Sequence, residues 1–455
     1  MYRIGVRGAG NTHEYEELVK IFLRPDEYSV EIAGPGDGSG FDLITSGDED
    51  KNIKKQEIYR ALSAVTGESP EWGIITGIRP VKLFGEIARE CPEDALAHAE
   101  KVFREYYLVS EEKTDLTRRI YELQQERFGE AEENSMGVYT GIPFCPTRCL
   151  YCSFASNPID GSDIEGYLAA LEKEIDACSE MARTSGMFAE SIYIGGGTPT
   201  SLTAEQLDRL LGRIEKGFMT EAVREATSEA GRPDTITEAK LEAAARHGFG
   251  RVSINPQSMK QETLVRIGRD HTPDDIRRAF GMARASGEWT VNADIIAGLP
   301  GEDTEDIVRT LDEIISLGAE NITVHSLAVK RTSRLKEKDP DYHYKRGRAV
   351  RAMLDAASEI LGKNGYRPYY LYRQKHMSGA LENVGYALPG TESLYNVRIM
   401  DEHQSILAMG AGAIGKDYCP RTRQLTRVPN VKDHKVYIER IDEMIRRKEK
   451  MFQEV

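Results

Sequence analysis

Short apolar stretches alternate with amphipathic segments through the middle of the chain. The stretches are rich in β-branched residues and predict strands, while the segments between them repeat apolar residues at helical spacing. This alternation predicts a parallel sheet with right-handed crossovers, either open or curled into a barrel. The expected strands are Gly137 to Ile142, Ser191 to Ile194, Val223 to Ser228, Arg251 to Asn255, Val291 to Ala297 and Asn321 to Leu327, with helices near 163–183, 203–217, 235–247, 260–286 and 303–318.

The flanking regions follow other patterns. Residues 1–70 mix strand-like and helical pieces, which predicts a small α+β N-terminal domain. Residues 71–135 are a helical segment that ends in an acidic linker of small residues. Beyond the expected barrel at 136–330 the alternation loosens, and residues 331–455 are expected to form a C-terminal cap and substrate region.

Polar residues and glycines recur where the expected strands end. The C-terminal ends of parallel strands meet at one rim, and the chemistry of such folds is found there. We therefore expect a single site at this rim. It would contain Cys145, Gly195, Gly196, Gly197, Glu229, Gln257, Asp294 and His325.

Three of the six cysteines form a tight cluster directly after the first expected strand. Cys145, Cys149 and Cys152 have the spacing C-x-x-x-C-x-x-C. Iron–sulfur clusters take thiolate ligands, and a cubane of four irons normally takes four of them. Three thiolates would leave one iron open to another ligand. A structural zinc site would usually need a second pair of Cys or His, which is not visible here, so the spacing favours an iron–sulfur cluster.

Composition narrows the functional classes. The net charge is −14, from 60 basic and 74 acidic residues, and no long basic block is present. Such a chain is a poor candidate for binding nucleic acid. It contains no apolar run long enough to span a membrane and begins without a signal-peptide pattern, which predicts a cytoplasmic protein.

The cysteine loop resembles the signature of the radical S-adenosylmethionine (SAM) superfamily, and the resemblance covers about 136–330. It implies a partial (β/α)6 TIM-like barrel. It also implies a [4Fe-4S] cluster whose open iron is chelated by the amino and carboxylate groups of SAM. Reduction would then release methionine and a 5′-deoxyadenosyl radical. By resemblance, the residues that contact SAM are Tyr139, Tyr151, Gly195, Gly196, Gly197, Thr198, Glu229, Gln257, Arg269 and Asp294.

Three longer motifs are similar to the oxygen-independent coproporphyrinogen III oxidase branch. They begin at Tyr139, Ile194 and Asp294, and the N-terminal stretch from Trp72 to Pro80 resembles the coproporphyrinogen dehydrogenase subgroup, which has a long N-terminal extension. The resemblance implies that two propionates of coproporphyrinogen III become vinyl groups, giving protoporphyrinogen IX. It also implies an electron donor such as flavodoxin or ferredoxin.

A substrate with four carboxylates needs cationic partners. Candidates are Lys330, Arg331 and Arg373, with Arg334 and Lys375 nearby, although a solvated basic face explains them almost as well. His325 is a candidate for substrate binding or proton movement, and a structural histidine is the alternative.

Two other functions stay open. Phe154 stands where the best-known oxidases carry a further cysteine, which motivates a radical SAM enzyme with another substrate. A haem-binding or trafficking protein on the same fold is the other. The stretch Tyr395 to Met400, however, lacks the His, Tyr and Trp of the H-N-x-x-Y-W motif of haem chaperones.

Overall fold

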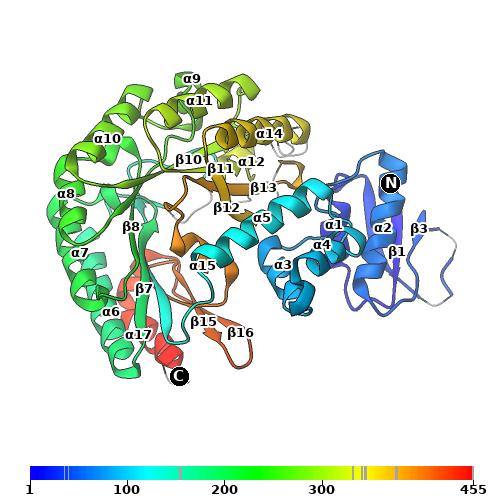
Figure 1. The fold of residues 1–455 in the computed structure, drawn as a ribbon, viewed down its shortest axis with the longest axis horizontal. Coiled ribbons are helices and arrows are strands. Elements are labelled where there is room, and N and C mark those ends of the chain that lie inside the picture. Colours follow the sequence, from blue (N-terminus) through cyan, green and yellow to red (C-terminus); the bar gives the residue numbers. More distant parts are fainter. Residues whose placement is uncertain are drawn as a thin grey trace.

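The computed structural model describes residues 1–34, 36–38, 40–152, 156–329, 333–339, 342, 346–374 and 378–452. A curved parallel sheet forms its centre (Figure 1). The strands are β4 (Ser135–Ile142), β7 (Phe188–Gly196), β8 (Glu225–Gly231), β9 (Arg251–Ile254), β10 (Thr290–Ala297) and β11 (Asn321–Ser326). Neighbours in the order β11-β10-β9-β8-β7-β4 are all parallel, which confirms the predicted sheet.

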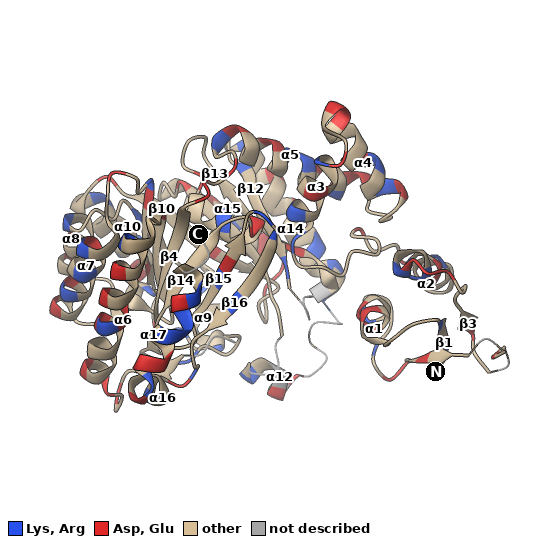
Figure 2. Cartoon of the chain, turned by 90° about the horizontal axis from the view of Figure 1, so that it is seen from below, with Lys and Arg blue, Asp and Glu red and all other residues tan. Residues whose placement is uncertain are grey.

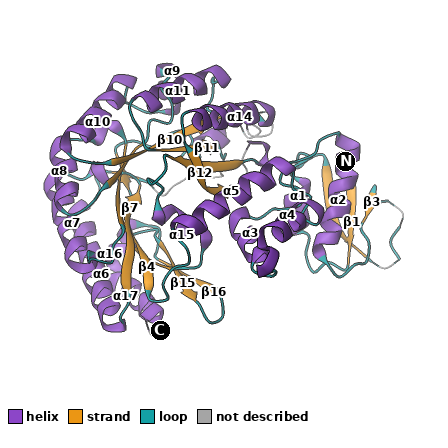
Figure 3. Cartoon of the chain, viewed as in Figure 1, coloured by secondary structure: helices purple, strands orange, loops and turns teal. Residues whose placement is uncertain are grey.

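The crossover helices lie outside the curve of the sheet (Figure 3). They are α6 (Ile164–Ser185), α7 (Ala204–Phe218), α8 (Glu238–Arg246), α9 (Gln261–Ile267), α10 (Pro273–Ser286) and α11 (Thr304–Ser316). Side chains of Asp163, Thr203, Thr272 and Asp303 cap four of their N-termini. The helical segment expected at 260–286 is divided, because Gly268 adopts a left-handed φ of 75° that ends α9.

Charged residues of both signs are interspersed over the outer helices (Figure 2). Arg209 on α7 pairs with Glu172 on α6 at 2.8 Å, and Arg213 pairs with Asp176 at 3.2 Å. Each exposed pair contributes less than about 1 kcal/mol, so the apolar faces of the helices dominate their attachment to the sheet. No helix in the described part of the chain is long and apolar enough to cross a membrane.

The C-terminal region extends the sheet at both edges. The added strands are β12 (Arg367–Arg373), β13 (Glu382–Ala387), β14 (Ser405–Met409), β15 (Ile414–Cys419) and β16 (Gln424–Pro429). Strand β13 pairs antiparallel with β11, and β14 pairs parallel with β4. The accompanying helices are α12 (Arg334–Lys338), α14 (Gly347–Lys363), α15 (Leu394–Asp401), α16 (His434–Glu439) and α17 (Ile441–Glu449).

The first 66 residues form a small sheet with its own apolar core. Strands β1 (Tyr2–Arg7), β2 (Tyr28–Ala33) and β3 (Leu43–Ile44) are parallel, in the order β2-β1-β3, and are accompanied by α1 (His13–Val19) and α2 (Lys51–Thr66). Ile4, Leu18 and Ile58 are buried together in this core.

The helical segment that follows, up to Arg127, connects this small domain to the barrel. It comprises α3 (Pro80–Ala88), α4 (Ala95–Glu105) and α5 (Glu111–Arg127), and α5 packs on β12 (Figure 1). Trp72 Nε1 and Lys113 Nζ donate to the two carboxylate oxygens of buried Glu382 on β13, at 2.7 and 2.8 Å. This buried, charge-assisted arrangement fixes the helical segment against one edge of the sheet.

Candidate active site

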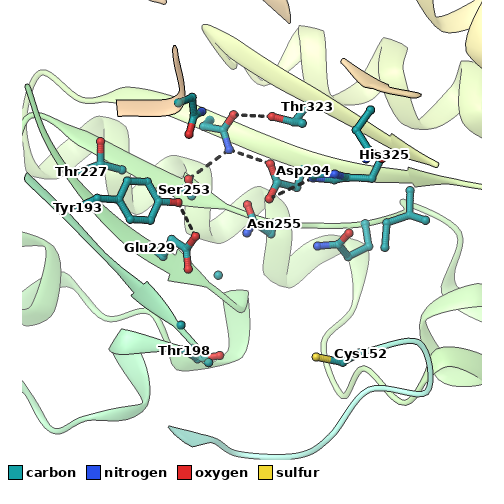
Figure 4. Close-up of a pocket in the computed structure, with 18 of the residues that line it drawn as sticks. Cys152, Tyr193, Thr198, Thr227, Glu229, Ser253, Asn255, Asp294, Thr323 and His325 are labelled. Carbon is teal, nitrogen blue, oxygen red and sulfur yellow. Dashed lines mark hydrogen bonds and ion pairs between the residues drawn. The ribbon is translucent and has the colours of Figure 1, made fainter. Parts of the chain in front are cut away.

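A cavity of about 470 Å³ lies inside the curve of the sheet. The interior of a closed (β/α)8 barrel is normally filled by branched apolar side chains. Here most inward positions are polar instead, as Figure 4 shows for several of them. These inward residues are Thr227, Glu229, Arg251, Ser253, Asn292, Asp294, Thr323 and His325. A polar interior of this size indicates a binding chamber.

The cysteine loop closes one end of this cavity. Cys145 ends the short strand β5 (Phe144–Cys145), which pairs with β6 (Asn157–Pro158), and Cys145, Cys149 and Cys152 all line the cavity. Hydrogen bonds from neighbouring segments hold the loop. Leu150 N donates to Ile267 O at 2.8 Å, and Arg232 Nη1 donates to Thr147 Oγ1 at 2.7 Å.

The loop fits an iron–sulfur cluster. A Cβ on Gly197 would lie 3.0 Å from Cys145 Sγ and 2.5 Å from Phe144 O, so only glycine leaves this space beside the thiol open. In the described residues, no three Cys, His, Asp or Glu side chains converge as a single metal ion requires. A cubane does not need such convergence, because each thiolate binds its own iron. Burial raises the pKa of the Cys145 thiol to about 11, and cluster binding would displace its proton.

Glu229 lies beside the glycine turn that follows β7. It accepts a short hydrogen bond from Tyr193 OH, and a Cβ on Gly195 would lie 2.8 Å from Glu229 Oε2. Burial raises the pKa of Glu229 to about 7, and the nearby charge of Asp294 adds to the effect. Gly195 lies beside the Glu229 carboxylate and does not line the cavity. Gly196, Gly197 and Thr198 do line it.

The raised pKa of Glu229 predicts a pH dependence of stability. The folded carboxyl holds its proton more tightly than the unfolded one. Its stabilising contribution is therefore complete below an unfolded pKa of about 4.3 and is lost as the pH rises through about 7. Between about pH 5 and pH 8.5 we expect the cluster-free wild type to lose roughly 2 kcal/mol more stability than Glu229→Gln. Denaturant unfolding measures this difference, and parallel pH profiles would contradict it.

Asp294 and His325 form a linked pair on β10 and β11 (Figure 4). Asn292 Nδ2 donates to Asp294 Oδ1 at 2.9 Å, and His325 Nε2 lies 3.6 Å from Asp294 Oδ2. His325 Nδ1 is 3.2 Å from Tyr372 OH. Burial would raise the pKa of Asp294, but the bonds from His325 and Asn292 outweigh it and hold the pKa below its usual range. A carboxylate is thus kept ionised and oriented inside the cavity.

Arg269 and Gln257 complete this end of the cavity. Arg269 Nη2 donates to Tyr151 OH at 3.0 Å and its Nη1 donates to Asn255 O at 2.9 Å. Gln257 adopts a φ of 66°, which is rare outside glycine, and its side-chain oxygen is buried with no hydrogen-bond partner among the described residues. Strained, unsatisfied positions of this kind cluster where ligands bind.

Neither of the candidate substrate cations in the described residues faces the cavity. Arg373 was expected there, but its guanidinium donates to the carbonyls of Ile75 and Ala380 and lies 5.3 Å from the ring of Trp72. Arg334 is exposed on α12, outside the cavity lining. Lys330, Arg331, Phe154 and Lys375 lie outside the described residues.

Several lining residues were not anticipated. They include two arginines, Arg232 and Arg251, and the tyrosines 193, 369, 370, 372 and 395. Tyr139 and Tyr193 are stacked at 6.3 Å, and Tyr193 and Tyr395 at 4.5 Å, so aromatic rings cover one wall. The signal for Arg251 was the alternation of inward and outward positions along β9, whereas Arg232 follows the end of β8.

Comparison with known proteins agrees with this site. A family model described as the Radical SAM superfamily matches residues 139–314. The oxygen-independent coproporphyrinogen-III oxidase-like protein HemZ of Bacillus subtilis is 37% identical over 465 residues, which covers 98% of this chain and 92% of that protein. The chain belongs to this family of radical SAM proteins. The cofactors of a radical SAM protein are a [4Fe-4S] cluster and SAM.

Two further proteins are similar to this radical SAM protein. Heme chaperone HemW of Bacillus subtilis is 30% identical over 307 residues, covering 67% of this chain and 76% of that protein. Among solved structures, coproporphyrinogen III oxidase (HemN) from Escherichia coli has a TM-score of 0.56 and 23% identity, covering 71% of this chain and 73% of that one. This last likeness shows that the fold is shared.

Proposed function

We propose that this radical SAM protein oxidatively decarboxylates coproporphyrinogen III, converting two propionates to vinyl groups to give protoporphyrinogen IX. The observation that carries the proposal is the lining of the cavity, where Arg232 and Arg251 share one chamber with the three cysteines. Arginine is suited to binding carboxylates. The relationship to the oxidase-like protein HemZ supports the same substrate class.

In this proposal the cluster and SAM, when bound, supply the radical that removes a β-hydrogen from a propionate. Carbon dioxide then leaves, and one electron passes to an acceptor. Cys145, Cys149 and Cys152 would hold the cluster, and the polar residues around them would hold SAM. We further propose an electron donor such as flavodoxin or ferredoxin, and a cytoplasmic location.

The chain's own residues have distinct proposed tasks. Arg269 would bind the methionine carboxylate of SAM, because its guanidinium is already aligned by Tyr151 and Asn255. Asp294 would accept from hydroxyl or amine groups of SAM, since it is held ionised by His325. Glu229 would accept from the amine beside the glycine turn. His325 then acts as a positioning residue for Asp294.

Replacing Asp294 with alanine is expected to weaken SAM binding about 10- to 100-fold, because a charge-assisted hydrogen bond is lost. Iron content should be unchanged. Equilibrium binding of SAM to the reconstituted protein measures the effect. Asp312→Ala is a suitable control, since Asp312 is exposed on the outer helix α11. If the two variants bind SAM with the same affinity, Asp294 does not hold the cofactor.

The experiment that tests the function is an anaerobic assay. The protein is reconstituted with iron and sulfide and incubated with SAM, a strong reductant and coproporphyrinogen III. Chromatography then follows 5′-deoxyadenosine and the porphyrin products. We expect both 5′-deoxyadenosine and protoporphyrinogen. Deoxyadenosine without any change in the porphyrin, even with cell extract supplying an electron acceptor, would indicate a radical SAM enzyme with a different substrate.

Haem binding is the second candidate function, because the HemW relatives are named as haem chaperones. In this chain the stretch from Tyr395 to Met400 belongs to α15, and four of its residues line the cavity. Tyr395 is stacked on Tyr193 at 4.5 Å and would have to move for a haem to enter. A haem titration that produces a Soret shift at stoichiometric haem would favour the chaperone function over turnover.

A further inference from the structure

From the level of Asp294 the cavity extends toward the N-terminal ends of the parallel strands. Arg251 begins β9 and is level with Thr290, four residues before Asp294 on β10. At the rise of a parallel strand this places Arg251 about 13 Å deeper along the sheet. Between the two levels, Asn292 donates to Ser253 Oγ at 3.1 Å. Level with Asp294, Thr323 lies 3.2 Å from Tyr370 OH. Polar side chains therefore continue from the level of Asp294 to that of Arg251.

Arg251 is held firmly at this depth. Its side chain is buried, with the residue 8% exposed. Nη2 donates to Thr391 O at 2.7 Å and to Glu392 O at 3.3 Å, and Nε lies 3.4 Å from Glu225 Oε2. Nε and Nη1 are both buried without a hydrogen-bond partner in the part of the chain that the structure describes.

The neighbouring acid does not fully neutralise this arginine. Glu225 also accepts hydrogen bonds from Ser393 Oγ and from the backbone nitrogens of Leu394 and Tyr395, so its charge is shared with the start of α15. Arg251 lines the cavity. Buried guanidinium donors without a partner at the wall of a cavity indicate that a ligand group can bind there.

We propose that Arg251 forms an anion subsite at the deep end of the cavity, which takes a substrate carboxylate remote from the reacting carbon. A guanidinium N–H with no other partner is a strong donor to a carboxylate. The inference rests on the proposed function, because a tetrapyrrole with several carboxylates can place one at depth while another reacts near the cysteine loop. Such an anchor would orient the reacting arm.

The test compares coproporphyrin III with its tetramethyl ester, which lacks the carboxylate charges. Binding of each is measured by fluorescence to reconstituted wild type, Arg251→Gln and Arg251→Lys. We expect Arg251→Gln to weaken binding of the acid by about 10- to 100-fold and to leave the ester unchanged. Arg251→Lys keeps the charge and should retain more of the affinity for the acid than Arg251→Gln does.

Arg398→Gln is the matched control. Arg398 is as buried as Arg251 and also bonds carbonyls and a carboxylate, Glu190, but does not line the cavity. Unchanged affinity of Arg251→Gln for the acid overturns the subsite. Equal losses for acid and ester would show a structural role only and would also overturn it. If wild type binds neither compound, the proposed function itself fails, together with the subsite.

Discussion

Cys149→Ala is expected to remove the iron–sulfur cluster and to reduce cleavage of SAM to the background of cluster-free protein. Cys149 is the most buried of the three clustered cysteines, and all three line the same cavity. With two thiolates left, the cluster loses a ligand on one further iron and its attachment to the loop. Iron and sulfide content, the visible absorption of the cluster and the yield of 5′-deoxyadenosine measure the outcome.

A cysteine elsewhere in the chain provides the control for this variant. Cys91 is partly exposed between α3 and α4 and is not part of the cavity lining. Cys91→Ala should therefore keep full iron content and full SAM cleavage. The ligand assignment would be wrong if Cys149→Ala kept a complete cubane, or if Cys91→Ala lost as much iron.

The parallel strands could be predicted because helices cover their outer faces. In β10, Val291, Ala293 and Ile295 are buried, while Asn292 and Asp294 between them line the cavity. Such alternation of apolar and polar residues marks a strand. The rule that chemistry gathers at the C-terminal ends of these strands then placed Glu229 and Asp294 in one cavity. Strand type and order were thus accessible from local pattern, although most ends differ by one to three residues.

The direction of Arg373 could not be predicted without recognising β12 as a strand. The run from Tyr366 to Arg373 contains Pro368, which weakens a strand interpretation. Once the strand is known, alternation explains the result. Tyr370 and Tyr372 face the cavity, so Arg373 points to the other face, toward Trp72. From its charge, Arg373 was expected to contact the substrate. The alternation of side chains along β12 directs it toward Trp72 instead.

Arg251 was missed for a related reason. The segment Arg251-Val252-Ser253-Ile254 alternates, with Arg251 and Ser253 lining the cavity and Val252 and Ile254 in the apolar core. That alternation was present in the sequence. Functional residues were expected at the C-terminal ends of the strands, however, and Arg251 lies at the opposite end of β9. The arrangement of Thr391 and Glu392 around Arg251 depends on contacts between residues about 140 positions apart, which no local pattern contains.

A buried ion pair joins the C-terminal helix to the barrel. Lys448 on α17 and Glu174 on α6 are both fully buried, and Lys448 Nζ lies 2.5 Å from Glu174 Oε1 and 2.7 Å from Asn430 Oδ1. Glu174 Oε2 also accepts from Tyr437 OH at 2.6 Å and from Gly410 N at 2.8 Å. Every oxygen of the carboxylate is therefore paired, which offsets the cost of burying the charges.

Lys448→Met is expected to destabilise the protein by about 3–5 kcal/mol, because it leaves the Glu174 carboxylate buried without its counter-ion. Denaturant unfolding with a far-UV signal measures the change. The control is Lys173→Ala. Lys173 joins the same two helices through Asp442 at 2.6 Å, but the two side chains are 55% and 64% exposed, so its loss should cost less than about 1 kcal/mol. Equal costs for the two variants would contradict the role of burial.

Lys448→Met should also affect the end of the cavity that carries the three cysteines. A Cβ on Gly410 would lie 2.4 Å from Gly141 O, so the loop that Glu174 holds packs directly against β4, one residue before the strand ends. Tyr167 OH bonds both Gly141 O, at 2.6 Å, and Ala411 N, at 3.1 Å. Loosening this contact in Lys448→Met should lower iron retention on warming before global unfolding begins, whereas Lys173→Ala should retain iron as wild type does.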